Sequence, residues 1–250
     1  MIAENSSGDI NLDGLINITG SLGCDETYPE FTGTQITSIH SKSLTSIGDQ
    51  LTLYVAPLIK NISFPNLQSV GGVIYIGEAP LLTSIDLSSV QTLGTWLRIF
   101  LAWKLTELKF PMNANGEHTQ AGIGITATAL KDLNNFISTP GGVYFTDNYF
   151  MEELTIDVSG TTFFGPNNQP LDGIGAIVVA NNSAAVNVSL PNLSSTDGYI
   201  QVDNCSALSI PALYKINGSF TMQNASFRSL EAPNLGVVNG ALNITGSFSG

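Results

Sequence analysis

The sequence is poor in charge, in basic residues and in long apolar runs. Only 11% of its 250 residues are charged, and 8 Lys and Arg stand against 20 Asp and Glu, which gives a formal net charge of −12. Binding to a phosphate backbone or an anionic membrane needs clustered basic residues, so we expect no nucleic-acid partner. Arg98 and Lys104 interrupt the most apolar stretch, which stays below the roughly 18 residues of a membrane-spanning helix. We therefore expect no transmembrane segment.

The two ends also lack targeting signals. Residues 1–5 contain no basic and apolar leader, and residues 246–250 contain no hydrophobic tail of a GPI signal. We therefore expect one of two cases. Either the protein is cytosolic, or the chain is an internal fragment or a truncated gene product of a secreted protein.

Residues for catalysis and metal binding are scarce. The chain has 2 Cys and 2 His, and it has no phosphate-binding glycine loop, His-Glu-x-x-His or Cys-x-x-Cys pattern. We expect no catalytic residues, no metal and no cofactor. His40 and His118 stand in unrelated contexts. Asp147 and Asp203 are the carboxylates that fit one position of a repeat, and we expect them to cap turns.

Sequons are frequent. Asn-x-Ser/Thr occurs ten times, where about four would be expected from the Asn, Ser and Thr content. An Asn- and Ser-rich chain also produces sequons without glycosylation, but the excess favours a secreted glycoprotein.

A phrase of about 22 residues recurs along the chain. The four best copies are residues 64–76 (FPNLQSVGGVIYI), 190–202 (LPNLSSTDGYIQV), 210–222 (IPALYKINGSFTM) and 232–244 (APNLGVVNGALNI). The anchoring apolar residues of all copies are Leu15, Leu44, Leu67, Val90, Leu193, Leu213 and Leu235. Stacked repeats bury a face that one repeat cannot bury alone. We therefore predict an all-β fold, a right-handed parallel β-helix or leucine-rich-repeat-like solenoid with coils of about 20–25 residues. The alternative is an antiparallel β-sandwich, but that fold does not require a fixed repeat length and so does not explain the repeat.

The phrase also predicts how each coil is built. Alternating apolar residues before and after the anchor predict two short strands per coil. Glycine at Gly72, Gly198, Gly218 and Gly240 predicts a tight bend that needs positive φ. Residues 127–137 show helical spacing, which predicts a short helix there. We expect residues 1–250 to form a single solenoid, with a division into two lobes near 111–137.

Asparagine recurs just after several strands. Stacking would superpose Asn148, Asn182, Asn204 and Asn224 into a ladder of amides along the turns. Because ladder amides face inward, glycans are expected at other sequons. We predict glycosylation at Asn61, Asn187, Asn217, Asn17 and Asn243.

Aromatic residues on or beside the strands have two interpretations. Tyr75, Tyr144, Tyr199, Phe145 and Phe220 could form a strip that stacks on sugar rings, but packing in the core is favoured because inward positions need large side chains. The two cysteines, Cys24 and Cys205, would lie about eight coils apart, which is too far for a disulfide between them. Cys205 is then a buried thiol or pairs with a segment outside the chain.

Residues 63–72 (SFPNLQSVGG) and 204–213 (NCSALSIPAL) resemble the receptor L-domain-like coils of fungal GPI-anchored cell-wall organisation proteins. The resemblance implies a secreted glycoprotein at the outer face of the plasma membrane or in the cell wall, required for wall integrity and without catalytic residues. The family's signal peptide, early cysteine-containing coil, Ser/Thr-rich stalk and GPI signal have no counterpart here.

Three hypotheses about function follow. The first is a non-enzymatic scaffold that binds a wall polysaccharide such as β-glucan, or wall proteins. The second is a carbohydrate-active β-helix enzyme, a hydrolase or lyase, on analogy of fold alone. The third is a receptor-like ligand-binding domain. Uncapped end coils would also allow end-to-end self-association.

Overall fold

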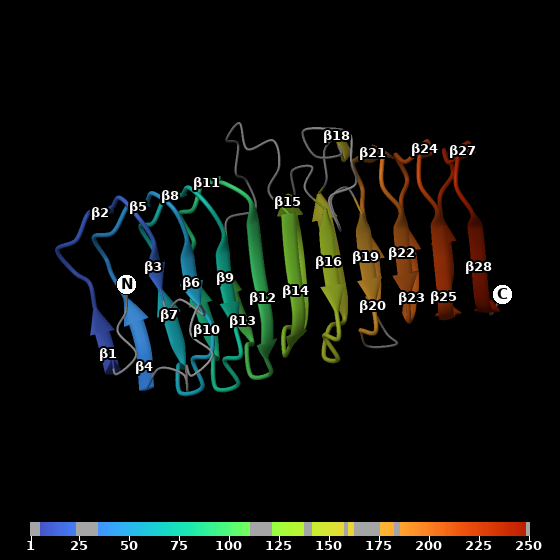
Figure 1. Ribbon diagram of the computed structural model, residues 1–250. Coiled ribbons are helices and arrows are strands. Elements are labelled where there is room, and N and C mark those ends of the chain that lie inside the picture. The colour runs from blue at the N-terminus through green and yellow to red at the C-terminus, as the bar shows by residue number, and fades with distance from the viewer. Residues whose placement is uncertain are drawn as a thin grey trace. The chain divides into compact units, whose positions relative to one another are not determined.

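The computed structural model describes residues 6–23, 35–110, 122–137, 142–157, 160–162, 176–182 and 186–248. Within these ranges the chain contains strands and no helix. It forms two compact units. Most of their strands are labelled in Figure 1. Unit 1 extends to residue 110 and includes Ile125–Leu130, and unit 2 includes 122–124 and continues from Lys131.

Three parallel sheets build unit 1. The first sheet contains β1 (Ser7–Asn11), β4 (Gln35–His40), β7 (Asn61–Ser63), β10 (Ser84–Asp86) and β13 (Glu107–Lys109). The second contains β2 (Asn17–Ile18), β5 (Ser46–Ile47), β8 (Ser69–Val70) and β11 (Thr92–Leu93). The third contains β3 (Leu22–Gly23), β6 (Leu51–Leu53), β9 (Ile74–Gly77) and β12 (Trp96–Ala102).

Unit 2 repeats this arrangement. Its first sheet contains β15 (Asp132–Ile137), β17 (Glu153–Asp157), β20 (Val186–Ser189), β23 (Cys205–Ser209) and β26 (Ser229–Glu231). Its second contains β18 (Gly160–Thr162), β21 (Leu193–Thr196), β24 (Lys215–Ile216) and β27 (Val237–Val238). Its third contains β16 (Val143–Thr146), β19 (Ile177–Ala180), β22 (Ile200–Asp203), β25 (Phe220–Phe227) and β28 (Leu242–Phe248). The residues of β14 (Gly122–Thr128) are divided between the units.

Apolar side chains of successive coils meet in register inside each unit. Leu51, Ile74 and Leu97 are parallel partners in the third sheet of unit 1, are spaced 23 residues apart and are fully buried. In unit 2 the same position is taken by Ile177, Ile200 and Phe220. Each coil therefore completes the core of its neighbour, and the predicted parallel β-solenoid is confirmed.

The predicted anchors line this core in the inner coils. Leu44, Leu67, Val90, Leu193 and Leu213 are at most 1% exposed. In the outermost described coils, Leu15 is 47% exposed and Leu235 is half-buried. The anchor is thus buried in the inner coils and more open in the first and last described coils.

The structure corrects the predicted number of strands. A full coil has three strands, because a strand of the second sheet lies between the two predicted ones. In unit 1 these extra strands are only two residues long, as in Ser46–Ile47 and Ser69–Val70. Two residues are too few to show the alternation by which a strand is recognised in a sequence.

The predicted helix at 127–137 is wrong. Asp132–Ile137 forms β15, which pairs in parallel with β17. Helical spacing over one short segment is a weak local preference, and the backbone hydrogen bonds offered by the neighbouring coil override it.

The glycine prediction was right about the corner and wrong about the cause. Gly72, Gly218 and Gly240 do not have positive φ. Instead, a Cβ on Gly218 would lie 2.5 Å from the carbonyl oxygen of Gly198 in the preceding coil. Gly48, Gly71 and Gly94 form a similar column in unit 1, where an added Cβ would also meet the neighbouring backbone at under 3.0 Å. Glycine is needed there because the coils approach too closely for a side chain.

Candidate functional site

The outer face of the third sheet in unit 1 carries a group of aromatic side chains. Alternation along β6, β9 and β12 turns Leu53, Ile76 and Ile99 into the core, where all are fully buried. On each strand, the residues that alternate with these buried ones point outward. Among the outward residues, Thr52, Tyr75 and Arg98 are register partners on adjacent strands. We call Tyr54, Tyr75, Trp96, Arg98 and Phe100 the aromatic face.

Three of these rings form a compact cluster. The ring centroids of Tyr75 and Phe100 are 5.0 Å apart, and Tyr54 lies 5.9 Å from Tyr75 and 5.8 Å from Phe100. All three pairs are tilted, a geometry favoured by aromatic side chains. The hydroxyl of Tyr54 donates to Glu78 Oε1 at 2.7 Å, which fixes the orientation of that ring.

Gly77 makes room for the cluster. It is the strand partner of Phe100, and a Cβ at Gly77 would lie within 3.0 Å of the Phe100 ring. The ring therefore lies directly on the backbone of β9. Beside the cluster, the guanidinium of the exposed Arg98 lies over the Trp96 ring, 4.9 Å from its centroid.

The predicted aromatic strip is only partly found here. Tyr75 belongs to the aromatic face, whereas Phe145 and Phe220 are buried in the core of unit 2. Tyr144 packs against an aliphatic cluster of unit 2, and Tyr199 is 41% exposed there. Sequence reasoning missed Tyr54, Phe100 and Trp96. The available signal was the coil length, because 54, 77 and 100 are spaced 23 residues apart.

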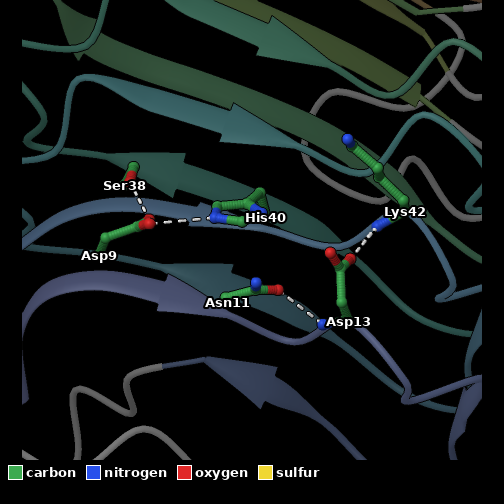
Figure 2. A network of polar contacts seen from close by, with 6 residues as sticks. All are labelled: Asp9, Asn11, Asp13, Ser38, His40 and Lys42. Carbon is green, nitrogen blue, oxygen red and sulfur yellow. Dashed lines mark hydrogen bonds and ion pairs between the residues drawn. The ribbon is translucent and has the colours of Figure 1, made fainter.

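A polar network joins the first two coils on the first sheet of unit 1 (Figure 2). The carboxylate of Asp9 accepts hydrogen bonds from the hydroxyl of Ser38 and from His40 Nε2, the latter at 3.1 Å. The Ser38 hydroxyl first, and His40 second, lower the pKa of Asp9 below its ordinary 3.8. Here the carboxylate lies between the hydroxyl and the imidazole. In a nucleophilic triad the histidine takes the middle position, so this network is not a triad.

The same network continues through the turn after β1. Asn11 Oδ1 accepts a hydrogen bond from the backbone N–H of Asp13 at 2.8 Å, and Asp13 Oδ1 accepts one from the N–H of Lys42 at 2.6 Å (Figure 2). The first of these contacts shapes the turn of the first coil, and the second holds that coil to the next one. In the part of the chain that the structure describes, no group of three or more His, Cys, Asp or Glu side chains could hold a metal ion.

The two carboxylates that could share a coil position do not share one. The register pairs Thr146 with Ala180, and Asp203 follows Val202, the partner of Val179. Asp203 therefore occupies the position of Thr146, one residue before that of Asp147. Asp203 accepts hydrogen bonds from the Gln201 side chain at 2.6 Å and from the backbone N–H of Gln223 at 3.1 Å. His118 lies outside the described residues.

Two curated fungal proteins are similar to this chain. Protein ecm33 of Aspergillus fumigatus is 28% identical over 236 residues, which cover 94% of this chain and 48% of that protein. A cell surface GPI-anchored protein of Arthroderma benhamiae is 29% identical over 145 residues, which cover 56% of this chain and 33% of that protein. The chain is thus similar to two fungal proteins, one of them a GPI-anchored protein of the cell surface.

This relationship confirms the predicted family resemblance and the predicted place at the cell wall or the outer face of the plasma membrane. The chain spans about half the length of the first of these relatives and a third of the second. No family model matches the chain, and no solved structure matches it. None of the described residues forms a helix long and apolar enough to cross a membrane.

The structure brings together two of the four residues of the predicted asparagine ladder, Asn148 and Asn182. The buried side chain of Asn182 accepts a hydrogen bond from the Asn148 N–H at 2.9 Å and donates one to the Phe145 carbonyl at 2.8 Å. By the register of β19 and β22, Cys205 takes the position of Asn182, whereas Asn204 takes the position of Asn181. Asn224 lies in β25, and its side chain is outside the described part.

A different ladder, which the sequence did not reveal, lies beside the glycine column of unit 2. Asn217 Nδ2 donates to Asp197 Oδ1, and Asn239 Nδ2 donates to Asn217 Oδ1 at 2.8 Å. Side chains of three consecutive coils are thus joined. Asn217 is also one of the predicted glycosylation sites.

The other predicted glycosylation sites have more open surroundings. Asn17, Asn187 and Asn243 are exposed, and Asn61 is half-buried. Through Oδ1, Asn187 accepts a hydrogen bond from Ser206 at 2.7 Å, and Asn61 accepts one from Ser84 at 2.8 Å. Asn17 Oδ1 accepts from Thr45 and Ser46. In these contacts only Oδ1 accepts hydrogen bonds. The amide nitrogen, the atom to which a glycan would be attached, takes no part in them.

Cys205 is fully buried and unpaired with another cysteine. Burial raises the pKa of its thiol to about 12. A thiol that stays protonated is a poor nucleophile, so Cys205 has a structural role. Cys24 lies outside the described residues.

Proposed function

We propose that this protein is a non-enzymatic scaffold of the fungal cell wall that binds a wall component, a polysaccharide such as β-glucan or a wall protein. The observation that carries the proposal is the outer face of the third sheet in unit 1, where half-buried aromatic side chains and the exposed Arg98 of consecutive coils lie side by side. Solenoids use such extended surfaces to bind extended partners. The similarity to a fungal cell surface GPI-anchored protein over 56% of the chain supports a place at the cell surface.

The scaffold is a glycoprotein in this proposal. Asn187, Asn17 and Asn243 are the favoured sites because their side chains are exposed. Asn61 is half-buried and follows them. Asn217 is the least suitable of the five, because its amide nitrogen already donates to Asp197.

Co-sedimentation with insoluble polysaccharides tests the function. The purified chain is mixed with β-glucan, chitin or pectin, and both the bound protein and the reducing ends released into solution are measured. Binding without release supports a scaffold. Release of reducing ends would replace the scaffold by a carbohydrate-active enzyme, and absence of binding to all three would rule out the polysaccharide as the wall component.

A further inference from the structure

The aromatic face is not part of the core of unit 1. The inward residues of the same strands, among them Leu53, Ile76 and Ile99, are fully buried and fill the interior without it. The outer face of a sheet open to water usually carries polar side chains. Aromatic residues gathered on such a face mark a site that binds something.

The rings of this face are held in place before any ligand arrives. Phe100 rests on Gly77, Tyr54 is tied to Glu78, and the three ring centroids lie 5.0 to 5.9 Å apart. A surface that is already ordered loses little conformational entropy on binding. The face is therefore built as a platform rather than as a set of mobile side chains.

The chemistry of the platform selects a ligand with apolar faces and a polar rim. A pyranose ring has C–H groups on its two faces and hydroxyls around its edge, so it can stack on an aromatic ring while hydrogen bonding sideways. Arg98 beside the cluster offers donors, and Glu78 offers acceptors. Both are present at the rim of the same face.

Charge then distinguishes among polymers with stackable rings. Nucleobases and acidic sugars also stack, but their polymers are anionic, and this chain has a net charge of −12 with only 8 basic residues. A neutral polysaccharide does not experience this repulsion. Among polymers with stackable rings, a neutral polysaccharide therefore fits the platform best, and β-glucan is the neutral polysaccharide named in the proposed function.

We propose that the aromatic face binds a neutral glucan chain, with pyranose rings stacked on Tyr54, Tyr75 and Phe100. This assignment rests on the proposed wall-binding function and gives it a site and a ligand class. Tyr75 is the central residue, because its ring lies against both other rings of the cluster.

The test measures binding of laminarin, a soluble β-1,3-glucan, by isothermal titration calorimetry and by the fluorescence of Trp96 and Trp103. Tyr75→Ala is expected to weaken the Kd about tenfold, and Tyr75→Phe to leave it nearly unchanged because the stacking ring remains. Tyr214→Ala is the matched control, since it removes a 53% exposed tyrosine from unit 2. Circular dichroism checks that each variant is folded.

The outcomes separate the site from the function. Equal laminarin affinity in the parent, Tyr75→Ala and Phe100→Ala chains would overturn the site and leave the proposed function standing. Tighter binding of polygalacturonate than of laminarin would overturn the neutral ligand class. If the parent chain binds neither polymer, both the site and the polysaccharide form of the proposed function are lost.

Discussion

Unit 1 and unit 2 turn the same corner with different side chains. At the end of several strands of the third sheet, one residue adopts positive φ: Val55, Glu78, Leu101 and Ala127 in unit 1, and Asp147, Asn181 and Asn204 in unit 2. Asp and Asn tolerate this left-handed conformation better than other residues with a Cβ. The backbone path is common to both units, but unit 1 follows it with less suitable residues.

The next residue at this corner also differs. In unit 1 it is alanine at Ala56, Ala79 and Ala102, which are fully buried, and Thr128 after Ala127, which is 2% exposed. In unit 2 it is Asn148, Asn182 and Cys205. Val55, Glu78 and Leu101 are spaced evenly, 23 apart, whereas 34 residues separate Asp147 from Asn181. We infer that even coils stack on small side chains alone, whereas an uneven coil is tied to its neighbour by a buried amide.

Removing that amide is expected to have the largest effect. Asn182→Ala loses two buried hydrogen bonds, to the Asn148 N–H and the Phe145 carbonyl, and leaves a small cavity. We expect a loss of about 3 kcal/mol in the free energy of unfolding, measured by urea denaturation of the unglycosylated chain. The reciprocal change Ala79→Asn, which overfills the corner of unit 1, should cost about 2 kcal/mol. A loss below about 1 kcal/mol in Asn182→Ala would show that the amide does not tie the coils.

The glycine column gives the next largest effect. Gly71→Ala in unit 1 places a methyl group against the carbonyl of Gly48, and the backbone of two coils must move apart. We expect a loss of about 2 kcal/mol in the same measurement. Gly20→Ala is the control, because a Cβ there would meet nothing within 4 Å. Equal stabilities of the two variants would contradict close coil approach as the reason for glycine.

These corners show where sequence reasoning succeeds and where it stops. Repetition of the anchors Leu67, Leu193 and Leu213 predicted the solenoid, because every coil must bury an apolar residue at the same position. The repeated glycines predicted a corner for the same reason. Glycine is needed at these corners because the adjacent coil lies too close for a side chain. That closeness depends on how segments about 20 residues apart pack together, so the local sequence pattern does not reveal it.

The candidate site was harder to predict than the fold. The sequence favours a core position for Tyr75 because inward positions need large side chains. A shift of one residue, which the sequence does not fix, exchanges inward and outward positions. The structure fixes the shift by burying Ile74 and Ile76. The ladder from Asp197 to Asn239 was missed since its members differ in residue type and become neighbours only when the coils stack.

The smallest expected effect concerns the left-handed residue itself. Asn181 is exposed, has φ of 55° and lies at the position that valine takes in unit 1 as Val55. Asn181→Val should lower the free energy of unfolding by about 1 kcal/mol, because a branched Cβ disfavours this conformation, while Asn181→Gly should leave it nearly unchanged. Urea denaturation of both variants makes the comparison. If Asn181→Val were as stable as the parent chain, a branched residue with positive φ would not lower the free energy of unfolding at this corner. Val55, Glu78 and Leu101 would then be as suitable in unit 1 as Asp or Asn.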